Sequence, residues 1–244
     1  SGTVTITQPP VLTVAITAST NVLCNGAATG SATAAANGGT AAYTYAWSTG
    51  ATGASASSLA AATYTVTATD ANGCTTNQSR TITQPAAALA AVVNSSQNVN
   101  CFGNGTGSID IGVSGGTGPY SYSWNSGAST QDLTGLTAGT YTINITDANG
   151  CTATQSATIT QPAAALSSTA TVTSQVACFA GNNGAIDLSV AGGTTPYSYV
   201  WSNGASSQDI SSLTAGTYTV TITDANGCTN QRSASVTQPS AALS

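Results

Sequence analysis

The sequence predicts an all-β protein, built as a tandem array of small β-sandwich repeats. The first observation behind this prediction is the hexapeptide TDANGC, which occurs at Thr69–Cys74, Thr146–Cys151 and Thr223–Cys228, at intervals of 77 residues. The second is the alternation of apolar and polar residues across Tyr141–Thr146, which is typical of a half-buried strand. The third is that no segment has a helical period, and Thr-rich sequence punctuated by Gly disfavours helix.

The 77-residue period runs through the whole chain and defines its organisation. Tryptophans and cysteines keep this period, and so does the TITQP-like segment that closes each unit. We therefore expect residues 1–9 to be the last strand of a preceding repeat, 10–85 to be repeat 1, 86–162 repeat 2, 163–239 repeat 3, and 240–244 the start of a following repeat. The chain is thus expected to be a segment of a longer array.

Each repeat has the strand content of an immunoglobulin-like or fibronectin-type-III-like sandwich. Roughly five to seven short strands fit in each repeat, with turn signals about every 8–12 residues. The run LTAGTYTVTITD, which ends at Asp224, is similar to the approach to the next-to-last strand of fibronectin-type-III-like domains. In such domains a tyrosine after a Gly-Thr corner ties the loop back to the sheet. This resemblance implies that role for Tyr64, Tyr141 and Tyr218, with Trp47, Trp124 and Trp201 as core aromatic residues.

The TDANG segment is expected to form a hairpin turn before the last strand of each repeat. An aspartate at the first turn position accepts backbone N–H bonds, while asparagine and glycine tolerate positive φ. The turn residues so assigned are Asp70, Asn72 and Gly73, then Asp147, Asn149 and Gly150, then Asp224, Asn226 and Gly227.

The six cysteines form two sets that keep the repeat period. Cys24, Cys101 and Cys178 lie in Gly- or Asn-rich loops, and Cys74, Cys151 and Cys228 start the last strand of each repeat. One regular pairing closes each repeat on itself, as Cys24–Cys74, Cys101–Cys151 and Cys178–Cys228, and another joins adjacent repeats, as Cys74–Cys101. We favour the first, one disulfide in each repeat, because the second leaves Cys24 and Cys228 unpaired. Such a bond would stabilise each repeat by about 4 kcal/mol.

Composition excludes several classes of function. Charged residues make up 4% of the chain, against about 25% in typical soluble domains. The ionic side chains are Asp and Arg alone, with a net charge of −5, so there is no basic patch for nucleic acid. Because no histidine is present to activate a serine or cysteine, we expect no enzyme and no catalytic residue. No apolar run approaches the ~20 residues of a membrane span, so no membrane insertion is expected.

Two pairs of aspartates are candidate calcium ligands. Asp110 with Asp132, and Asp187 with Asp209, offer carboxylate oxygens of the kind that bind calcium. Repeat 1 has Thr33 and Ser55 at the equivalent positions, so a site common to all repeats is excluded. Zinc spacing such as CxxC is absent. We favour turn capping for these aspartates and expect no metal and no other cofactor.

The aromatic row Tyr120, Tyr122 and Trp124 offers a second candidate site. Such residues stack on sugar rings in carbohydrate-binding sandwiches. However, the alternation of the strand places all three on one face, where packing in the core is favoured.

Several motifs occur in a fixed order that resembles a known family. A cysteine in a Gly/Asn-rich loop is followed by GGTGPYSYSW or GGTTPYSYVW, then TAGTYTVTITDANGCT, then a terminal TITQP or SVTQP. This order closely resembles the SprB-type repeat, found in tandem in giant surface adhesins of gliding bacteria and related extracellular filaments. Repeat 1 departs from it, with AAYTYAW and AAATYTV in place of the aromatic and corner segments. The resemblance implies type IX secretion, extracellular display at the cell surface, and no catalytic site.

We therefore expect a structural and adhesive repeat segment of a giant extracellular surface filament. Its expected partners are copies of itself in a multi-chain filament, because a neutral surface needs no desolvation of charge on contact, and a cell or substratum surface, including one that carries glycan. Persistent disulfides are consistent with this extracellular location. The alternative function is a carbohydrate-binding β-sandwich array.

Overall fold

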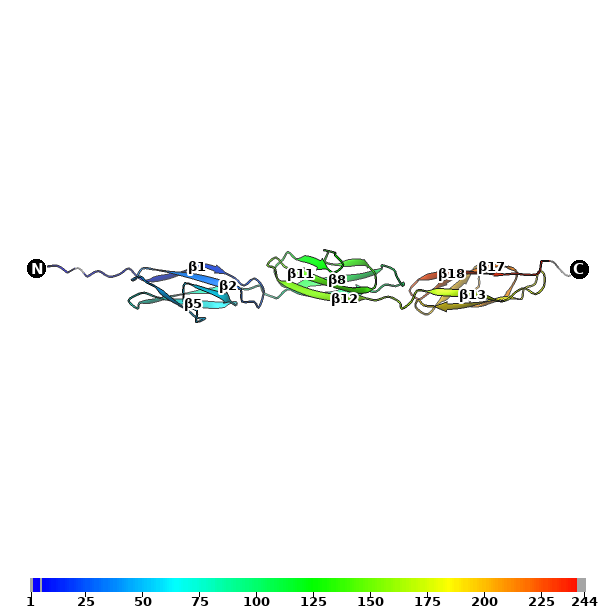
Figure 1. Ribbon diagram of the computed structural model, residues 1–244, viewed down its shortest axis with the longest axis horizontal. Coiled ribbons are helices and arrows are strands. Elements are labelled where there is room, and N and C mark those ends of the chain that lie inside the picture. Colours follow the sequence, from blue (N-terminus) through cyan, green and yellow to red (C-terminus); the bar gives the residue numbers. More distant parts are fainter. Residues whose placement is uncertain (1, 5, 241–244) are drawn as a thin grey trace. The chain divides into compact units, whose positions relative to one another are not determined.

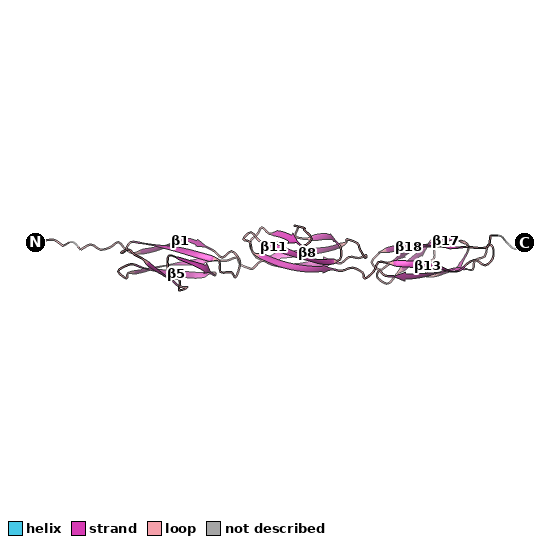
Figure 2. Cartoon of the chain, viewed as in Figure 1, coloured by secondary structure: helices cyan, strands magenta, loops and turns pink. Residues whose placement is uncertain are grey.

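The structure, a computed structural model, describes residues 2–4 and 6–240, which form strands and loops with no helix (Figure 1, Figure 2). Each repeat supplies six strands. In repeat 1 they are β1 (Thr13–Thr20), β2 (Gly30–Asn37), β3 (Thr44–Trp47), β4 (Ser55–Leu59), β5 (Ala62–Thr69) and β6 (Thr75–Ile82). In repeat 2 they are β7 (Ala90–Gln97), β8 (Gly107–Ser114), β9 (Ser121–Trp124), β10 (Leu133–Leu136), β11 (Gly139–Thr146) and β12 (Thr152–Ile159). In repeat 3 they are β13 (Ser167–Ser174), β14 (Gly184–Ala191), β15 (Ser198–Trp201), β16 (Ile210–Leu213), β17 (Gly216–Thr223) and β18 (Thr229–Val236).

The six strands of each repeat form two three-stranded sheets. Repeat 1 has the orders β1-β2-β4 and β3-β5-β6, repeat 2 has β10-β8-β7 and β12-β11-β9, and repeat 3 has β13-β14-β16 and β15-β17-β18. The pairing is antiparallel; β5 and β6 run in unbroken register from Ala62↔Ile82 to Thr69↔Thr75. The predicted all-β fold of three repeated units is confirmed.

The chain folds into two compact units, and the residues of repeat 2 are divided between them. The first unit runs to Val92 and adds Gly112–Ser129 and Ile143–Gln155. The second combines Val93–Ile111 and Thr130–Thr142 with the chain from Ser156 onward. Each unit thus contains one complete repeat together with part of the central one.

The core of each complete repeat is made of inward-facing side chains from both of its sheets and of one valine from the loop after its first strand. In repeat 1 it consists of Val22, Ala32, Ala34, Trp47, Ala56, Leu59, Val66 and Ile82. In repeat 3 it consists of Val176, Ile186, Leu188, Trp201, Ile210, Leu213, Val220, Ile222 and Val236. The tryptophans are buried, as core packing predicts, with Trp124 of repeat 2 also only 3% exposed.

The outer faces of the sheets carry pairs of hydroxyl groups in place of ion pairs. Thr63 lies opposite Thr81 with their Oγ1 atoms 2.9 Å apart, and Thr65 lies opposite Ser79 with the two hydroxyl oxygens 2.8 Å apart. In repeat 3, the Thr219 and Ser233 hydroxyls are also 2.8 Å apart. Such cross-strand pairs stabilise a sheet without any charge.

Repeat 1 has the smallest core side chains. Its Ala32, Ala34 and Ala56 occupy the positions that Ile186, Leu188 and Ile210 fill in repeat 3. Each alanine buries about three fewer carbon atoms, which corresponds to about 2 kcal/mol of lost hydrophobic stabilisation at each position.

We predict that repeat 1 is the least stable repeat, so its strand amides should exchange with deuterium faster than those of repeat 3 in native-state mass spectrometry. Leu188→Ala should remove about 2–5 kcal/mol of protection from repeat 3. The matched control is Val200→Ala, because Val200 is 66% exposed and its truncation should leave the exchange unchanged. Equal protection of the wild-type repeats would contradict the assignment.

Candidate functional site: the disulfide-linked junctions

The disulfides join successive repeats, which corrects the predicted pairing. Cys24 of repeat 1 bonds to Cys151 of repeat 2, and Cys101 of repeat 2 bonds to Cys228 of repeat 3. Both bonds have a sequence separation of 127 residues and a Cα–Cα distance of 5.7 Å. The expectation of one disulfide within each repeat is therefore wrong, and so is the alternative pairing of Cys74 with Cys101. Within the described chain, Cys74 and Cys178 are free thiols.

The direction of the strands explains why a repeat cannot close its own pair. Cys74 directly precedes β6, whereas Cys24 lies in a loop at the other end of that strand. The Val22 N–H donates to the carbonyl of Thr83, which directly follows β6, at 2.9 Å. The eight residues of β6 span about 27 Å. Disulfide formation needs Cα atoms within about 7 Å of one another.

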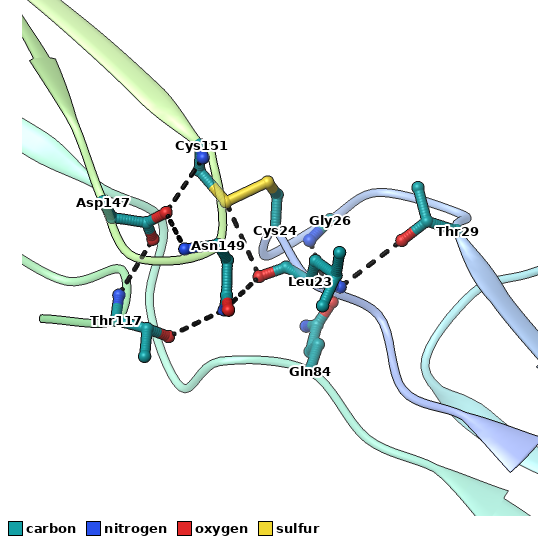
Figure 3. The surroundings of a disulfide bond; sticks show 9 residues. All are labelled: Leu23, Cys24, Gly26, Thr29, Gln84, Thr117, Asp147, Asn149 and Cys151. Atoms are coloured by element: carbon teal, nitrogen blue, oxygen red, sulfur yellow. Dashed lines mark hydrogen bonds between the residues drawn. A yellow bond between two sulfur atoms is a disulfide. The ribbon is translucent and has the colours of Figure 1, made fainter.

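The hairpin turn on the repeat 2 side of the first junction is organised by Asp147 (Figure 3). Its Oδ1 accepts the N–H groups of Asn149 and Cys151, both at 2.9 Å. Its Oδ2 accepts the N–H of Thr117 at 2.9 Å, which ties the turn to the preceding GGT loop. Asp147 is only 5% exposed, and these bonds satisfy its carboxylate. The turn therefore presents Cys151 in a fixed position.

The turn asparagine links the two repeats, a role that the sequence reasoning missed. Positive φ in this turn falls on Gly150, at +82°. The Asn149 Nδ2 instead donates to Thr117 Oγ1 at 3.0 Å and across the junction to the carbonyl of Leu23 at 3.1 Å (Figure 3). The Cys151 Sγ contacts that same carbonyl oxygen at 3.5 Å. A side-chain hydrogen bond therefore accompanies each disulfide.

The cysteine loop on the repeat 1 side is held by the terminal Gln-Pro of its own repeat. The Gly26 N–H donates to Gln84 Oε1 at 2.8 Å, and Asn25 Nδ2 donates to the carbonyl of Pro85 at 2.7 Å. The repeated TITQP signature therefore fixes the loop that carries Cys24. The same glutamine contact recurs from Gly103 to Gln161, at 2.8 Å.

The two glycines of the GGT loop, Gly115 and Gly116, lie between the linker and the hairpin turn. Gly115 has a φ of +67°, and a Cβ atom there would lie 1.9 Å from the carbonyl oxygen of Ala88. Gly116 donates its N–H to the carbonyl of Ala87 at 3.0 Å, and a Cβ atom at Gly116 would lie 2.8 Å from Asp147 Oδ2. Only glycine fits between the linker and the aspartate, which explains the repeated GGT.

The second junction repeats this geometry. Asn226 Nδ2 donates to the carbonyl of Asn100 at 2.9 Å and to Thr194 Oγ1 at 3.0 Å. Asp224 Oδ1 accepts the Cys228 N–H at 2.8 Å, and Oδ2 accepts the Thr194 N–H at 2.9 Å. The junction is therefore a repeated structural element.

The predicted corner tyrosines bond to the backbone four residues upstream. The Tyr64 hydroxyl donates to the carbonyl of Ala60 at 3.1 Å, and those of Tyr141 and Tyr218 donate to Thr137 and Thr214, both at 3.0 Å. The core tryptophans also use their polar atom, as Trp47 Nε1 donates to the carbonyl of Gly53 at 3.0 Å. These hydrogen bonds of both residue types are made within a repeat.

The second aspartate of each pair accepts a backbone N–H of its own sheet. Asp132 Oδ1 accepts the N–H of Ile111, and Asp209 Oδ1 accepts the N–H of Leu188, both at 2.9 Å. Asp110 Oδ1 accepts Asn94 Nδ2 at 3.4 Å. Among the described residues, no group of three or more His, Cys, Asp or Glu could hold a metal ion.

Hydrogen bonding lowers the pKa of two turn carboxyl groups. Burial of Asp147, the largest influence, would raise its pKa above the ordinary 3.8, but the N–H groups of Cys151, Thr117 and Asn149 together outweigh it and lower the pKa. The pKa of Asp70 is also lowered, chiefly by the N–H of Thr40, against an opposing effect of burial. In their ionised form, both carboxyl groups therefore stabilise the folded state.

Comparison with known families and sequences confirms the SprB-type resemblance. The SprB repeat family matches residues 16–52, 93–129 and 170–206. Each matched segment contains the first cysteine, the glycine pair and the tryptophan of its repeat. No curated protein sequence matches the chain. No helix in the described residues is long and apolar enough to cross a membrane.

Solved structures of other multidomain proteins match the chain at low identity and with TM-scores below 0.5. The eight N-terminal Ig domains of Down Syndrome Cell Adhesion Molecule match at 12% identity and a TM-score of 0.41, covering 92% of this chain and 42% of that one. A 1.5-MDa bacterial ice-binding adhesin matches at 15% identity and a TM-score of 0.39, covering 95% and 98%. Domains 3–5 of Drosophila OTK match at 10% identity and a TM-score of 0.35, covering 96% and 97%.

The turn carboxylates predict a specific loss of stability in acid. Because the folded-state pKa values of Asp70 and Asp147 lie below the ordinary 3.8, their stabilisation is present above about pH 4 and is lost as the pH falls below it. Calorimetry from pH 7 to pH 2 should show this fall in the melting temperature. The double variant Asp70→Asn, Asp147→Asn should melt several degrees lower at pH 6 and show a flatter acid limb. Parallel acid limbs in the variant and the wild type would contradict the assignment.

Proposed function

This chain carries three SprB repeats, and from that premise we propose that it is a structural and adhesive repeat segment of a giant extracellular filament at a cell surface. The observation that carries the proposal is the junction, in which the first cysteine of one repeat bonds to the second cysteine of the next, twice with the same geometry. Disulfides persist in oxidising compartments, which supports an extracellular location and export. Type IX secretion is part of this proposal.

The junction suits a chain that transmits tension. Each pair of successive repeats is joined by the main-chain linker and, in parallel, by a disulfide. The shortest covalent route from one terminus to the other enters at Cys24, crosses to Cys151, returns along repeat 2 to Cys101, and crosses to Cys228. Residues 25–100 and 152–227 lie outside this route. Tension therefore bypasses both linkers and most of repeats 1 and 3.

The low charge of the chain supports association with copies of itself. A typical exposed sandwich surface displays about a quarter or more charged residues, whereas this chain has 4% in total and places hydroxyl pairs on its sheets. Contact between two such surfaces requires no desolvation of charge. A multi-chain filament of identical chains is therefore part of the proposal, as is adhesion to a cell or substratum surface.

Sugar binding and catalysis receive less support. The tryptophans of the aromatic rows are 2–3% exposed, so their ring faces are not free to stack on a sugar. The tyrosine hydroxyls nearby are engaged within the repeat, as Tyr120 donates to the carbonyl of Gly115 at 2.7 Å. The chain also lacks histidine, so a non-enzymatic role fits its composition.

The tension-bearing role predicts how far the chain extends when pulled from its ends. With both disulfides intact, roughly 90 residues lie in the force route, which gives about 320 Å at full extension. After reduction all residues are in series, and the extension should reach about 850 Å. Single-molecule force spectroscopy measures both lengths.

A matched variant tests the same route one bond at a time. Replacing Cys24 and Cys151 together by Ser leaves only the Cys101–Cys228 bond, and the extension should rise to about 410 Å. Equal extensions for the wild type and this variant, both in the absence of reductant, would rule out the proposed force route.

The adhesive role predicts that the chain retains particles on a surface under shear. Beads coated with the oxidised chain should stay on cells or glass at flow rates that remove albumin-coated beads. Excess free chain should abolish this retention, because it occupies the same contacts. Retention no greater than that of albumin would refute adhesion by this segment, and loss of retention only on glycan-free surfaces would favour sugar binding instead.

A further inference from the structure

Eight asparagines of the chain directly precede a glycine, and such pairs can lose the side-chain amide without an enzyme. In this reaction the glycine nitrogen attacks the Cγ atom of the asparagine, because glycine has no Cβ atom to block the approach. The reaction needs the nitrogen next to the carboxamide and a glycine N–H that is not bonded elsewhere. These two requirements separate the eight pairs, which begin at Asn25, Asn37, Asn72, Asn104, Asn149, Asn183, Asn203 and Asn226.

In six of these pairs one of the two reacting groups is bonded elsewhere. Gly26 and Gly204 donate their N–H to a glutamine side chain and to a tryptophan carbonyl, at 2.8 and 2.9 Å. The Asn183 Oδ1 accepts the N–H of Ala177 at 3.0 Å. In the three hairpin turns the glycine N–H donates to the carbonyl of the turn aspartate at 3.0 Å, from Gly73, Gly150 and Gly227. Breaking such a bond costs free energy, so these six pairs are protected.

The pair at the end of β2 in repeat 1 is arranged differently. Asn37 is exposed, and the N–H of Gly38 donates to the Oδ1 atom of Asn37 itself at 2.8 Å. The glycine nitrogen is therefore held against the carboxamide that it would attack. Repeats 2 and 3 have Ser114 and Ala191 at the position of Asn37, so they lack this pair.

The backbone around this pair is fixed on both sides. The Gly38 carbonyl accepts the Tyr43 hydroxyl at 2.6 Å, and the Gly39 N–H donates to the carbonyl of Pro10 at 2.7 Å. Gly38 has a φ of +77°, and a Cβ atom there would lie 2.1 Å from the carbonyl oxygen of Val11. These contacts keep the nitrogen and the carboxamide together in the folded chain, which is the arrangement that favours reaction between them.

From this geometry we propose that Asn37 is a self-modification site, at which the folded chain deamidates its own side chain. The Gly38 nitrogen gives up its proton to solvent and attacks Cγ of Asn37. The new N–Cγ bond closes a cyclic imide, the Cγ–Nδ2 bond breaks, and Nδ2 leaves as ammonia after taking a proton. Water then opens the imide at either carbonyl carbon and leaves an aspartate or an isoaspartate. One water is consumed and one ammonia is released, with no oxidant, reductant or cofactor.

The eighth pair, Asn104 and Gly105, lies between these two cases. Both residues are exposed in the loop that carries Cys101. The Asn104 N–H donates to the carbonyl of Cys101 at 3.0 Å. No hydrogen bond in the described chain joins the Asn104 carboxamide to the Gly105 nitrogen. This pair is neither protected nor preassembled, so its reaction should be slower than that of Asn37.

The product changes the loop that the turn aspartate of repeat 1 holds. Both products place a new negative charge at position 37, and isoaspartate adds one carbon atom to the main chain between β2 and this loop. The loop is closely packed there, because a Cβ atom at Gly39 would lie 2.6 Å from Asp70 Oδ2, which accepts the Thr40 N–H at 2.9 Å. Deamidation therefore loosens repeat 1 as the protein ages. This inference goes beyond the adhesive role and does not depend on it.

The test follows all eight pairs in one sample of the full chain. The oxidised protein is incubated in mildly alkaline buffer made with heavy-oxygen water, which marks only the residues that deamidate during the incubation. Mass spectrometry of its peptides should show label at Asn37 at least about tenfold faster than at the six protected pairs, and faster than at Asn104. Labelling at Asn104 that matches or exceeds that at Asn37, or equal labelling of all the pairs, would overturn the proposal.

A parallel incubation of the reduced chain in denaturant separates structure from sequence. The preference for Asn37 should disappear there, because the contact between Asn37 and Gly38 is lost. A preference that persists in the unfolded chain would show that the fold does not select this site.

Two variants test the loosening of repeat 1. Asn37→Ser introduces the residue that repeat 2 has at this position, and after ageing it should retain deuterium-exchange protection at residues 38–40 that the aged wild type loses. Asn104→Ser is the matched control and should lose that protection as the wild type does. Equal loss in aged wild type and Asn37→Ser would contradict the proposed effect of deamidation.

Discussion

The carboxylate of the turn aspartate holds together every part of the junction. At Asp147 one oxygen accepts the two N–H groups that position Asn149 and Cys151, and the other accepts the N–H of Thr117. The adjacent glycine pair then receives the linker through the carbonyl of Ala87. Loss of this carboxylate would remove the hydrogen bonds that fix the cysteine and the asparagine of the turn relative to the GGT loop, which contacts the linker. The strict recurrence of TDANGC follows from this requirement.

Much of the fold could be predicted from local sequence patterns. Alternation over Tyr141–Thr146 identified β11, and the 77-residue period identified the three repeats. These succeed because strand exposure and turn chemistry are local properties. The disulfide pairing could not be obtained from spacing, since a 50-residue interval within a repeat and a 127-residue interval between repeats are equally regular. Strand direction was the missing signal: Cys74 precedes the last strand, and the Cys24 loop lies beside its far end.

The role of the turn asparagine was hidden for a related reason. Asn149 looks like a residue chosen for positive φ, but the backbone requirement is met by Gly150. Its amide is used for a contact with Leu23, 126 residues away in sequence. No local pattern contains that partner. The same holds for Gln84, which reads as part of a strand ending but holds the loop of Cys24 through Gly26.

Because the chain has few charges, its stability should depend little on salt concentration and on pH near neutrality. Ion pairs on a protein surface weaken with salt and change with pH. The hydroxyl pairs across β5 and β6, and the disulfides at the junctions, do neither near neutral pH. What remains sensitive to acid is the small set of aspartate carboxylates that accept backbone N–H groups. The sheets and junctions are therefore held by bonds that do not weaken with salt concentration.

The overlap of the two disulfide-closed rings has a consequence for survival among proteases. One ring runs from Cys24 to Cys151 and the other from Cys101 to Cys228, so every peptide bond between Cys24 and Cys228 lies inside at least one of them. A single cut in that span, even in the linker after Pro85, leaves both fragments in one covalent molecule. Without a reductant, separating the two ends takes three cuts, one between Cys24 and Cys101, one between Cys101 and Cys151, and one between Cys151 and Cys228. The overlapping rings thus keep the molecule covalently connected after a single proteolytic cut.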